Sequence, residues 1–328
     1  MNRKTVTIIT PCYNGANFFD RYIKSILSQT YRPIELIIIN DGSTDDSEKK
    51  IKSYEIQLKD NEINLIYLFQ KNAGIGAAIQ NGLNQMTGEF FTWIDVDDFI
   101  LSTYLEKMVD FLEKYQDYGV VRSDGIVVDS EDLTKELYKM ADKNFDKFNP
   151  YMFENAISGK NFHFGYSVVR TDCFIKANNG RNIYTSRQGQ NWQILLPIFY
   201  NYKSGYIDEP LYVVCERDDS VSRKEVEYAP KMLQLEEYRN ILINVLNKLP
   251  MGDKDFIKYK KMVYERYAHR IFVLSMLNDD FCRAEREFRF LKQNRILTKK
   301  EKKLYGKRLQ RIDYWLYLKN KIFAKKSK

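Results

Sequence analysis

The sequence predicts an α/β protein with a mostly parallel central sheet, helices on both faces of that sheet, and an α-helical C-terminal region. Three observations indicate this fold class. Short β-prone runs alternate with segments of helical spacing along the first hundred residues. These runs are almost entirely apolar, which is typical of parallel strands covered on both faces. After residue 223 the pattern is helical throughout, with apolar residues such as Met232, Leu235 and Tyr238.

The first hundred residues are expected to contain four strands. These are residues 6–10, 34–39, 63–69 and 90–94. A helix follows the first strand, because apolar residues recur at helical spacing between residues 18 and 27. Ser43 or Thr44 is expected to cap the second helix, and the third helix ends near Met86.

The following segment is expected to complete the sheet. It contains a helix at residues 102–115, strands at 120–121, 126–128, 162–169 and 211–216, and a helix at 189–200. Residues 130–160 are polar and mixed, and we expect a loop with short helices over the ligand crevice. We place a domain boundary near residue 223, where the helical pattern begins.

The net charge of +8 is concentrated at one end of the chain. Residues 295–328 contain 13 Lys and Arg against 2 Asp and Glu, a net charge of +11, so residues 1–294 carry −3. Trp315 and Phe323 are among the apolar residues interleaved there, and this tail would suit an anionic membrane surface. The alternative is a solvated basic helix that packs on the body through its aromatic side chains.

Composition argues against several classes of protein. No run of about 18 apolar residues is present, so we expect no membrane span. The first residues lead directly into a strand pattern, without the apolar stretch of a secretory signal. The cysteines form no CxxC motif or Cys/His cluster, so we expect reduced thiols, a cytoplasmic protein and no zinc site. They are Cys12, Cys173, Cys215 and Cys282.

Three carboxylates follow the fourth predicted strand, in the stretch WIDVDDF. Asp95 and Asp97 are two residues apart and can point the same way, and Asp98 is turned by the bend that follows. Carboxylates this close repel one another unless a cation lies between them. Hard oxygen ligands with open positions suit Mg²⁺ or Mn²⁺. The alternative is a polar strand end whose acids cap the next helix.

The other predicted strands also end in polar or turn residues. Pro11, Asp41 and Asn72 follow the first three strands, as the acids follow the fourth. In parallel sheets, ligands bind in the crevice beyond the carboxyl ends of the strands. The sequence therefore predicts one ligand crevice at this edge.

Four motifs in this region resemble those of the family 2 glycosyltransferases, which have the Rossmann-like type-A nucleotide-sugar fold. The motifs are TIITPCYNG, IIINDGSTDDS, QKNAGIGAAIQNGL and GEFFTWIDVDD. The resemblance covers about residues 4–220. It implies transfer of a sugar from a nucleotide diphosphate donor, usually with inversion and a divalent metal. It also implies a nucleotide-sugar half at about 1–100 and an acceptor half at about 101–223, followed by a helical region at 224–328.

The resemblance implies roles for the residues of the first two motifs. Pro11, Tyr13 and Asn14 match the segment where the nucleotide base lies, and the Tyr13 ring can stack on uracil. Ordinary packing is the alternative for Tyr13. Asp41 matches the base-recognising aspartate, which can accept a hydrogen bond from N3–H of uracil. An Asx-turn before Gly42 is a second role for Asp41, compatible with the first.

The third and fourth motifs would hold the phosphates and the metal. Asn72 and Gly74 belong to a loop that enters a helix, where backbone N–H groups can face an anion, although glycine there can also serve only to shape a turn. Asp97 is the first choice for a direct metal ligand, and Asp95 would contact the ribose or a metal-bound water. Asp98 is either a further ligand or a helix cap.

The sequence departs from the family pattern in two places. Many relatives have Arg-Asn where this chain has Ile79-Gln80, so no arginine is carried over. The general base of an inverting transfer is typically the aspartate of a Glu-Asp pair, and this chain has Gln190-Asn191 there. An amide cannot accept that proton. Bacterial capsule and cell-surface members are similar to this chain in having GQNWQ at this place, so the segment does not indicate an inactive enzyme.

Other residues are candidates for the acceptor side. Gln190 and Asn191 would orient the acceptor, and Trp192 either stacks on a sugar or belongs to the core. Asp124 is a candidate base, with a turn role before Gly125 as the alternative, and His163 is a second candidate that is more often structural. Four residues lie where family members close a loop on the diphosphate, unless this is an ordinary surface loop. They are Arg217, Ser220, Ser222 and Arg223.

The function expected is a metal-dependent glycosyltransferase, using Mn²⁺ or Mg²⁺. We expect it to move a sugar from a UDP-type donor to a glycan or lipid-linked acceptor in surface polysaccharide biosynthesis. The expected location is the cytoplasm, at the inner face of the cell membrane if the basic tail binds there. A catalytically silent nucleotide-sugar or glycan binding module is the alternative. A nucleotidyltransferase is disfavoured because TPCYNG lacks a glycine-rich, lysine-bearing signature, and no nucleic-acid recognition module is visible.

Overall fold

The computed structural model describes residues 3–141, 145–160, 162–183, 186–216 and 227–307. The chain divides into two compact units. The first is Met1–Lys224 with Ile241–Tyr259, and the second is Glu225–Asn240 with Lys260–Lys328. The functional halves and the boundary at residue 223 stay a prediction.

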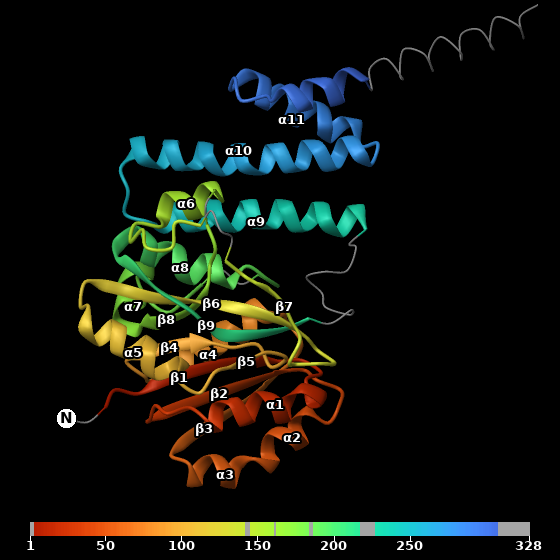
Figure 1. Cartoon of the computed structure of the whole chain (residues 1–328). Coiled ribbons are helices and arrows are strands. Elements are labelled where there is room, and N and C mark those ends of the chain that lie inside the picture. The colour runs from red at the N-terminus through yellow and green to blue at the C-terminus, as the bar shows by residue number, and fades with distance from the viewer. Residues whose placement is uncertain (1–2, 142–144, 161, 184–185, 217–226, 308–328) are drawn as a thin grey trace, which may run out of the picture. The chain divides into compact units, whose positions relative to one another are not determined.

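The sheet of the first unit begins with four parallel strands. They are β1 (Val6–Cys12), β2 (Ile34–Asp41), β3 (Ile63–Gln70) and β4 (Phe90–Trp93). In the sheet they lie in the order β3-β2-β1-β4, so all four carboxyl ends meet at one edge (Figure 1). The predicted parallel α/β sheet is therefore confirmed, with each expected strand within a few residues of its predicted bounds.

The sheet continues beyond β4 with mixed directions. The further strands are β8 (Tyr166–Arg170), β6 (Tyr118–Asp129), β9 (Lys203–Glu216), β5 (Phe99–Ile100) and β7 (Glu136–Lys139). β8 runs antiparallel to β4 and β6, whereas β9 runs parallel to β6. The two strands expected at 120–121 and 126–128 are one continuous strand, β6, whose pairing with β9 shifts register around Asp124.

Helices cover both faces of the parallel part of the sheet. They are α1 (Ala16–Leu27), α2 (Ser47–Ser53), α3 (Glu55–Asp60), α4 (Ile75–Gln85) and α5 (Tyr104–Lys114). Neighbouring residues of a strand point to opposite faces. Ile8 belongs to the core cluster that contains α1, whereas Ile9 lies against Gly82 of α4. α1 and α4 therefore pack on opposite faces.

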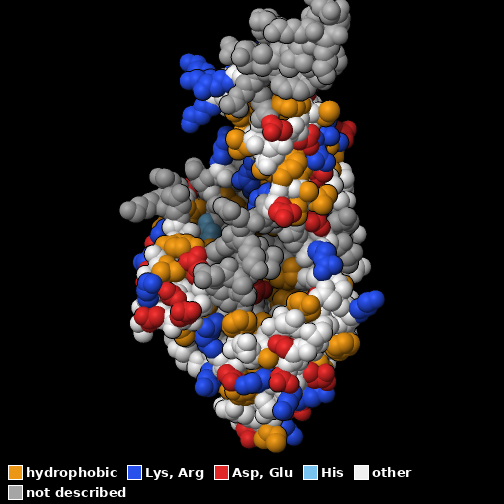
Figure 2. All heavy atoms as spheres, turned by 90° about the vertical axis from the view of Figure 1, so that its right-hand side faces the viewer, with side chains coloured by type: hydrophobic (Ala, Val, Ile, Leu, Met, Phe, Trp, Pro, Cys, Tyr) orange, Lys and Arg blue, Asp and Glu red, His pale blue; other side chains and the backbone are white. Residues whose placement is uncertain are grey.

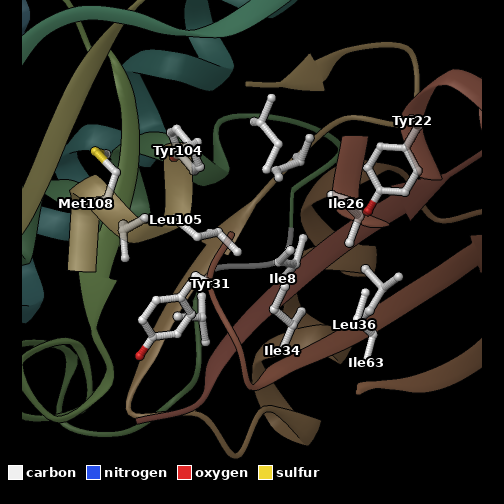
Figure 3. Packing of buried hydrophobic residues seen from close by; sticks show 14 of the residues in the cluster. Ile8, Tyr22, Ile26, Tyr31, Ile34, Leu36, Ile63, Tyr104, Leu105 and Met108 are labelled. Atoms are coloured by element: carbon white, nitrogen blue, oxygen red, sulfur yellow. The ribbon is translucent and has the colours of Figure 1, made fainter. Parts of the chain in front are cut away.

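One core cluster lies on the α1 face of the sheet and includes residues of α1 and α5. Figure 3 labels several of its members: Ile8, Ile34, Leu36 and Ile63 from strands, Tyr22 and Ile26 from α1, Tyr31, and Tyr104, Leu105 and Met108 from α5. Each of these side chains is at most 3% exposed. Burying such a side chain contributes about 1.5–3 kcal/mol, so this cluster supports the strand ends that carry the polar motifs.

The segment between β2 and β3 differs from expectation. Two short helices, α2 and α3, replace the single helix, and the residue at the N-cap of α2 is Asp46 rather than Ser43 or Thr44. The Ser43 hydroxyl instead accepts a hydrogen bond from the Asn14 N–H at 2.9 Å. Around α2 and α3, at the foot of Figure 2, acidic and basic side chains are interspersed, so this face has no dominant charge.

The rest of the first unit contains three more helices and the ends of two longer ones. The helices are α6 (Phe153–Ser158), α7 (Thr171–Asn178) and α8 (Gln190–Asn201). α6 and β7 lie in the segment expected to be a loop with short helices. α9 (Tyr228–Lys248) contributes its C-terminal part to this unit, and α10 (Asp253–Leu277) its N-terminal part.

The second unit is helical, as predicted for the region after residue 223. It contains the remainders of α9 and α10 together with α11 (Phe281–Gln293). Its core includes Phe272, Met276 and Leu291. Asp280 caps α11 by accepting a hydrogen bond from the Arg283 N–H at 3.1 Å. In the part of the chain that the structure describes, no helix is both long and apolar enough to span a membrane.

Candidate active site

A pocket of about 430 Å³ lies at the carboxyl ends of β1, β2 and β4. It is lined by Pro11, Cys12, Tyr13, Asn14, Gly15, Phe18, Asp41, Ile75, Asp95, Val96 and Asp97. Six of these residues are ones that the sequence motifs single out. Two larger hollows, of about 560 and 610 Å³, lie beside β3 and in the helical unit, but neither is lined by the acidic cluster. The strand-end pocket is therefore the candidate site.

The acidic cluster lies in the loop after β4. Oxygens of Asp95, Asp97 and Asp98 all lie within 4.8 Å of one another. The Asp98 N–H donates to the Asp95 carbonyl at 3.1 Å, and this turn gathers the three side chains. Hard carboxylate oxygens at such spacing fit Mg²⁺ or Mn²⁺, because those ions prefer oxygen ligands and keep positions for water and phosphate.

The charges of the cluster are held close together in a poorly solvated place. Burial raises the pKa of Asp95 to about 7, and the Asp97 charge adds to the increase. Burial also raises the pKa of Asp98 well above its ordinary value, and the charges of Asp97 and Asp95 raise it further. A divalent cation between the carboxylates would offset this repulsion.

Asp98 is tied to strand β9. Its Oδ1 accepts from the Cys215 N–H and its Oδ2 from the Tyr212 hydroxyl, both at 3.1 Å. The next long helix, α5, has Thr103 at its N-cap. The helix-cap alternative for Asp98 is therefore wrong, and its contacts anchor the acidic loop to the second half of the sheet.

Arg21 binds the backbone of the same loop, a role that sequence reasoning missed. Its guanidinium donates to the Asp97 carbonyl oxygen and lies over the Phe99 ring, 5.8 Å from the centroid. Arg21 and Asp97 are 76 residues apart in the chain, so no local spacing links them. A cation here also lowers the electrostatic cost of the acidic cluster.

Asp41 lies at the end of β2 and is 4% exposed. Its Oδ1 accepts from the Gln70 side chain at 2.7 Å and from the Ala73 N–H at 2.8 Å. Its Oδ2 accepts from the Gly74 N–H at 2.9 Å. The backbone N–H groups of the loop before α4 were expected to face a bound anion. In the structure, the Ala73 and Gly74 N–H groups donate to the carboxylate of Asp41.

The Asp41 carboxylate does not form the Asx-turn considered for it, and the Asn40 side chain holds this turn instead. The Asn40 Oδ1 accepts from the Ser43 N–H at 2.8 Å. The Asp41 carboxylate is instead used across the crevice edge, toward the loop after β3. Asn40 therefore holds the turn after β2, whereas Asp41 binds the loop after β3, a difference that the sequence alone does not reveal.

The first motif presents an uncovered aromatic ring. Tyr13 is 54% exposed and lines the pocket, so ordinary packing, the alternative considered for it, does not hold. Asn14 has a positive φ of 50° and its Oδ1 accepts from the Thr44 N–H at 2.8 Å. Pro11 lies within β1 and is paired in register with Ile39. The motif thus fixes a turn that leaves the Tyr13 ring facing solvent.

The loop that leads into α4 packs closely against the backbone of Ser186 and Arg187. Gly74 is the N-cap of α4 with φ of 91°, a conformation that favours glycine. A Cβ on Gly76 would lie 2.1 Å from the Ser186 carbonyl oxygen. Arg187 follows, and its guanidinium donates to the Asn72 Oδ1 at 3.0 Å. Sequence reasoning missed Arg187, whose partner is 115 residues away.

The base position is occupied by an amide that is already engaged. Asn191 lies in the first turn of α8, and its Oδ1 accepts from the Trp93 indole N–H at 2.9 Å. α8 therefore meets the end of β4, two residues before Asp95. Gln190 is half-buried at the start of the same helix.

Trp192 belongs to the core, which corrects the sugar-stacking role considered for it. It is 7% exposed. Its ring lies 4.3 Å from that of Phe164 and 5.9 Å from that of Phe162, centroid to centroid. Both contacts occupy surface that a sugar would need.

Asp124 lies inside strand β6, at its register shift, rather than after a strand. It is 4% exposed, and its Oδ1 accepts from the Gly125 N–H at 2.8 Å and the Ala141 N–H at 3.0 Å. These bonds match the turn role that was the alternative to a catalytic one.

His163 precedes β8, in a crowded and partly apolar setting. Burial lowers its pKa to about 4; the Asp124 charge acts against this and the Arg122 charge with it. Its carbonyl oxygen accepts from the Arg122 guanidinium at 2.8 Å, and its ring packs edge-on against Phe145. The imidazole is therefore neutral at pH 7. Arg217, Ser220, Ser222 and Arg223 lie outside the described residues.

Comparison with known proteins identifies the family. The family model described as glycosyl transferase family 2 matches residues 7–175, which is more than half of the chain. The chain is 28% identical over 214 residues to the glycosyltransferase GlyA of Streptococcus pneumoniae, covering 65% of this chain and 28% of GlyA. The matched region is thus under a third of that relative's length.

Two solved structures share the fold. TarS 1–349 of S. aureus, in complex with UDP-GlcNAc, has a TM-score of 0.57 at 17% identity, over 89% of this chain and 91% of that one. The mannosyltransferase PcManGT of Pyrobaculum calidifontis, in complex with GDP-Man and Mn²⁺, has a TM-score of 0.55 at 15% identity, over 94% and 81% of the two chains. With the family match, the strand-end motifs and this fold, the chain belongs to glycosyl transferase family 2.

Proposed function

We propose that this glycosyltransferase moves a sugar from a nucleotide diphosphate donor to a glycan or lipid-linked acceptor, with inversion and with Mn²⁺ or Mg²⁺. The observation that carries the proposal is one pocket lined both by Asp95 and Asp97, two members of the acidic cluster after β4, and by Asp41 at the end of β2. TarS in complex with UDP-GlcNAc and PcManGT with GDP-Man and Mn²⁺ support this class of donor and metal. A role in surface polysaccharide biosynthesis is part of the proposal.

Asp97 and Asp95 would hold the metal, with Asp98 as a further ligand. A bound divalent cation would supply Lewis-acid stabilisation of the charge on the departing diphosphate. The chain's own residues hold the carboxylates in place: Asp98 through β9 and the Asp97 backbone through Arg21. We assign Asp41 and Tyr13 to the base, and the backbone of Asn72 and Gly74 to the nucleotide side of the pocket.

The acceptor side uses α8. Asn191 cannot serve as the general base, because an amide does not accept the proton and its Oδ1 already binds Trp93. We propose that Asn191 and Gln190 orient the acceptor next to the end of β4. Asp124 and His163 stay as candidate bases, although the Asp124 contacts are those of a structural residue and the low pKa of His163 makes it a weak base.

Transfer from labelled nucleotide sugars, measured with and without Mn²⁺, tests the proposal. Asp97→Ala should abolish transfer and also the manganese-dependent rise in thermal stability with nucleotide, since both need the same carboxylate. Asp60→Ala, an exposed acid on α3, is the matched control and should leave both unchanged. Donor binding without any transfer in the unaltered protein would favour the silent binding module instead.

We also propose that the basic tail holds the enzyme at the inner, cytoplasmic face of an anionic membrane. Arg295, Lys299, Lys300, Lys302, Lys303 and Lys307 are its described cations, and residues 308–328 lie outside the described part. Each such charge near an anionic surface contributes about 1 kcal/mol.

A truncation tests this membrane proposal. Removing residues 308–328 spares Glu301, which is buried and paired with His269 at 2.6 Å. Salt-sensitive binding to phosphatidylglycerol vesicles should fall on truncation. Equal vesicle binding by the full and truncated chains would refute a role for this segment.

A further inference from the structure

We propose that Arg187, together with Asp41, reads the base of the nucleotide donor and selects uracil. This inference rests on the proposed function, because it assumes that a nucleotide diphosphate binds in the strand-end pocket. What it adds is Arg187, a specificity-determining residue that lies outside the four motifs of the family resemblance.

The layout of the sheet separates the base from the phosphates. Asp41 lies at the end of β2 and the metal-binding acids follow β4, with β1 between those strands. Two strand spacings correspond to about 10 Å. A nucleotide diphosphate whose phosphates lie at the acids therefore extends its base toward Asp41. Tyr13, at the end of the intervening β1, presents its exposed ring between the two.

Hydrogen-bond accounting at Asp41 limits what its carboxylate can accept. Each carboxylate oxygen has about two acceptor positions. Oδ1 already accepts from Gln70 and Ala73, at 2.7 and 2.8 Å. Oδ2 accepts only from Gly74 among the described residues, at 2.9 Å. One acceptor position is left, so Asp41 can take a single N–H from a base.

That one position distinguishes the four bases. Uracil presents one N–H at N3, flanked by two carbonyl oxygens. Guanine presents two adjacent donors, N1–H and the N2 amino group, so one of them would lose its partner at Asp41. Cytosine and adenine have an unprotonated ring nitrogen at the corresponding place, which would face the carboxylate with a lone pair. With the base ring held in one place, so that this ring position faces Asp41, uracil alone of the four satisfies the carboxylate without leaving a buried polar group unpaired.

Arg187 supplies the donor that a uracil carbonyl needs. Its backbone lies against the loop after β3, since a Cβ on Gly74 would come within 3.0 Å of the Arg187 Cα. Its guanidinium reaches the Asn72 Oδ1, on the same loop whose N–H groups bind Asp41. A guanidinium has five N–H donors, and this bond uses one. Arg187 is exposed, and no carboxylate pairs with it within the described residues.

The segment carrying Arg187 is anchored to α4 rather than loosely placed. The Gln80 Oε1 accepts from the Ile183 N–H at 2.7 Å, and its amide donates to the Arg181 carbonyl at 3.2 Å. Arg181 in turn donates to the Met86 carbonyl at 2.6 Å. The segment then runs along α4 to its N-terminal end, where Ser186 lies against Gly76 and Arg187 against Gly74, at the same edge of the sheet as Asp41. Among the described residues, those lining the pocket include three carboxylates and no Lys or Arg, so a cation at its edge is chemically complementary.

Calorimetric titration with UDP, GDP, CDP and ADP, in the presence of Mn²⁺, tests the inference on the full chain. The unaltered protein should bind UDP at least about tenfold more tightly than each of the other three. Arg187→Gln should weaken UDP binding roughly tenfold to hundredfold and reduce the UDP-to-CDP ratio, because the lost bond goes to a base carbonyl. Lys71→Gln, which removes a neighbouring exposed cation, is the control and should preserve the ratio.

Each remaining outcome counts against a specific part of the reasoning. If Arg187→Gln weakens all four diphosphates equally, the guanidinium contacts phosphate and base reading by Arg187 is wrong. If it binds UDP as the unaltered protein does, Arg187 has no role in the donor site. Tighter binding of GDP than UDP would overturn the accounting at Asp41. If the unaltered protein binds none of the four, the proposed function fails before this inference is reached.

Discussion

The two halves of the sheet treat their polar residues differently. In the first, residues 3–100, the polar groups predicted from motifs lie at strand ends, and most of them line one pocket, Asn72 and Asp98 being the exceptions. In the second, residues 101–216, Trp192 is packed in the core, and the Asp124 carboxylate accepts hydrogen bonds from backbone N–H groups. The parallel strands of the first half all end at one edge, whereas the second half mixes strand directions. A motif at a strand end therefore predicts a site residue only where the strands are parallel neighbours.

The comparison is tested most strongly at Trp192. Trp192→Ala should lower the free energy of unfolding by about 3–5 kcal/mol, because it leaves a cavity among Phe162, Phe164 and their neighbours. Chemical denaturation measures the change. Unchanged stability together with a higher KM for acceptor would mean that the ring is a sugar platform and that the two halves are alike.

Tyr13 is the matched aromatic of the first half. Tyr13→Ala should change the free energy of unfolding by no more than about 0.5 kcal/mol, since the side chain is 54% exposed. Its loss should weaken nucleotide binding by about 1–3 kcal/mol, the usual value of stacking between a base and an aromatic ring. Denaturation and calorimetry on the same variant separate the two effects. A large loss of stability with unchanged nucleotide affinity would reverse the assignment.

The smallest expected effect is the contribution of His163, in the second half of the sheet, to the pH dependence of stability. Its pKa in the folded chain, about 4, lies below the ordinary value of about 6.5. Between these values the unfolded chain binds a proton that the folded chain does not, so stability is lost as pH falls through this window. The slope is at most about 1.4 kcal/mol per pH unit, and solvent exposure of the ring reduces it.

A variant isolates the histidine from the other groups that titrate in the same range. Unfolding curves of His163→Gln should show a flatter dependence between about pH 6.5 and 4 than those of the unaltered protein. Arg122 and Asp124 are the charged groups that face the ring, and both are kept in this variant. Identical pH profiles for the two proteins would show that His163 is not held neutral by the fold.

The motif-bearing strands could be predicted because their signals are local. Each is an apolar run of fewer than ten residues that ends in a polar or turn residue, and the pairing of parallel neighbours brings those ends to one edge. The acidic cluster is local as well, since its three members lie within four residues. Tyr13 could be placed but not its exposure, because packing and solvent contact depend on what the rest of the chain covers.

The amino-acid sequence by itself determined a parallel sheet, a row of polar strand ends and the motifs of glycosyl transferase family 2, since those features depend on neighbouring residues. Only the tertiary structure decided which groups meet across the crevice. Asn191 binds Trp93 from 98 residues away, Arg187 reaches Asn72 from 115 residues away, and Arg21 holds the acidic loop across 76 residues. Such partners are set by the packing of helices and loops on the sheet, and no spacing along the chain encodes them.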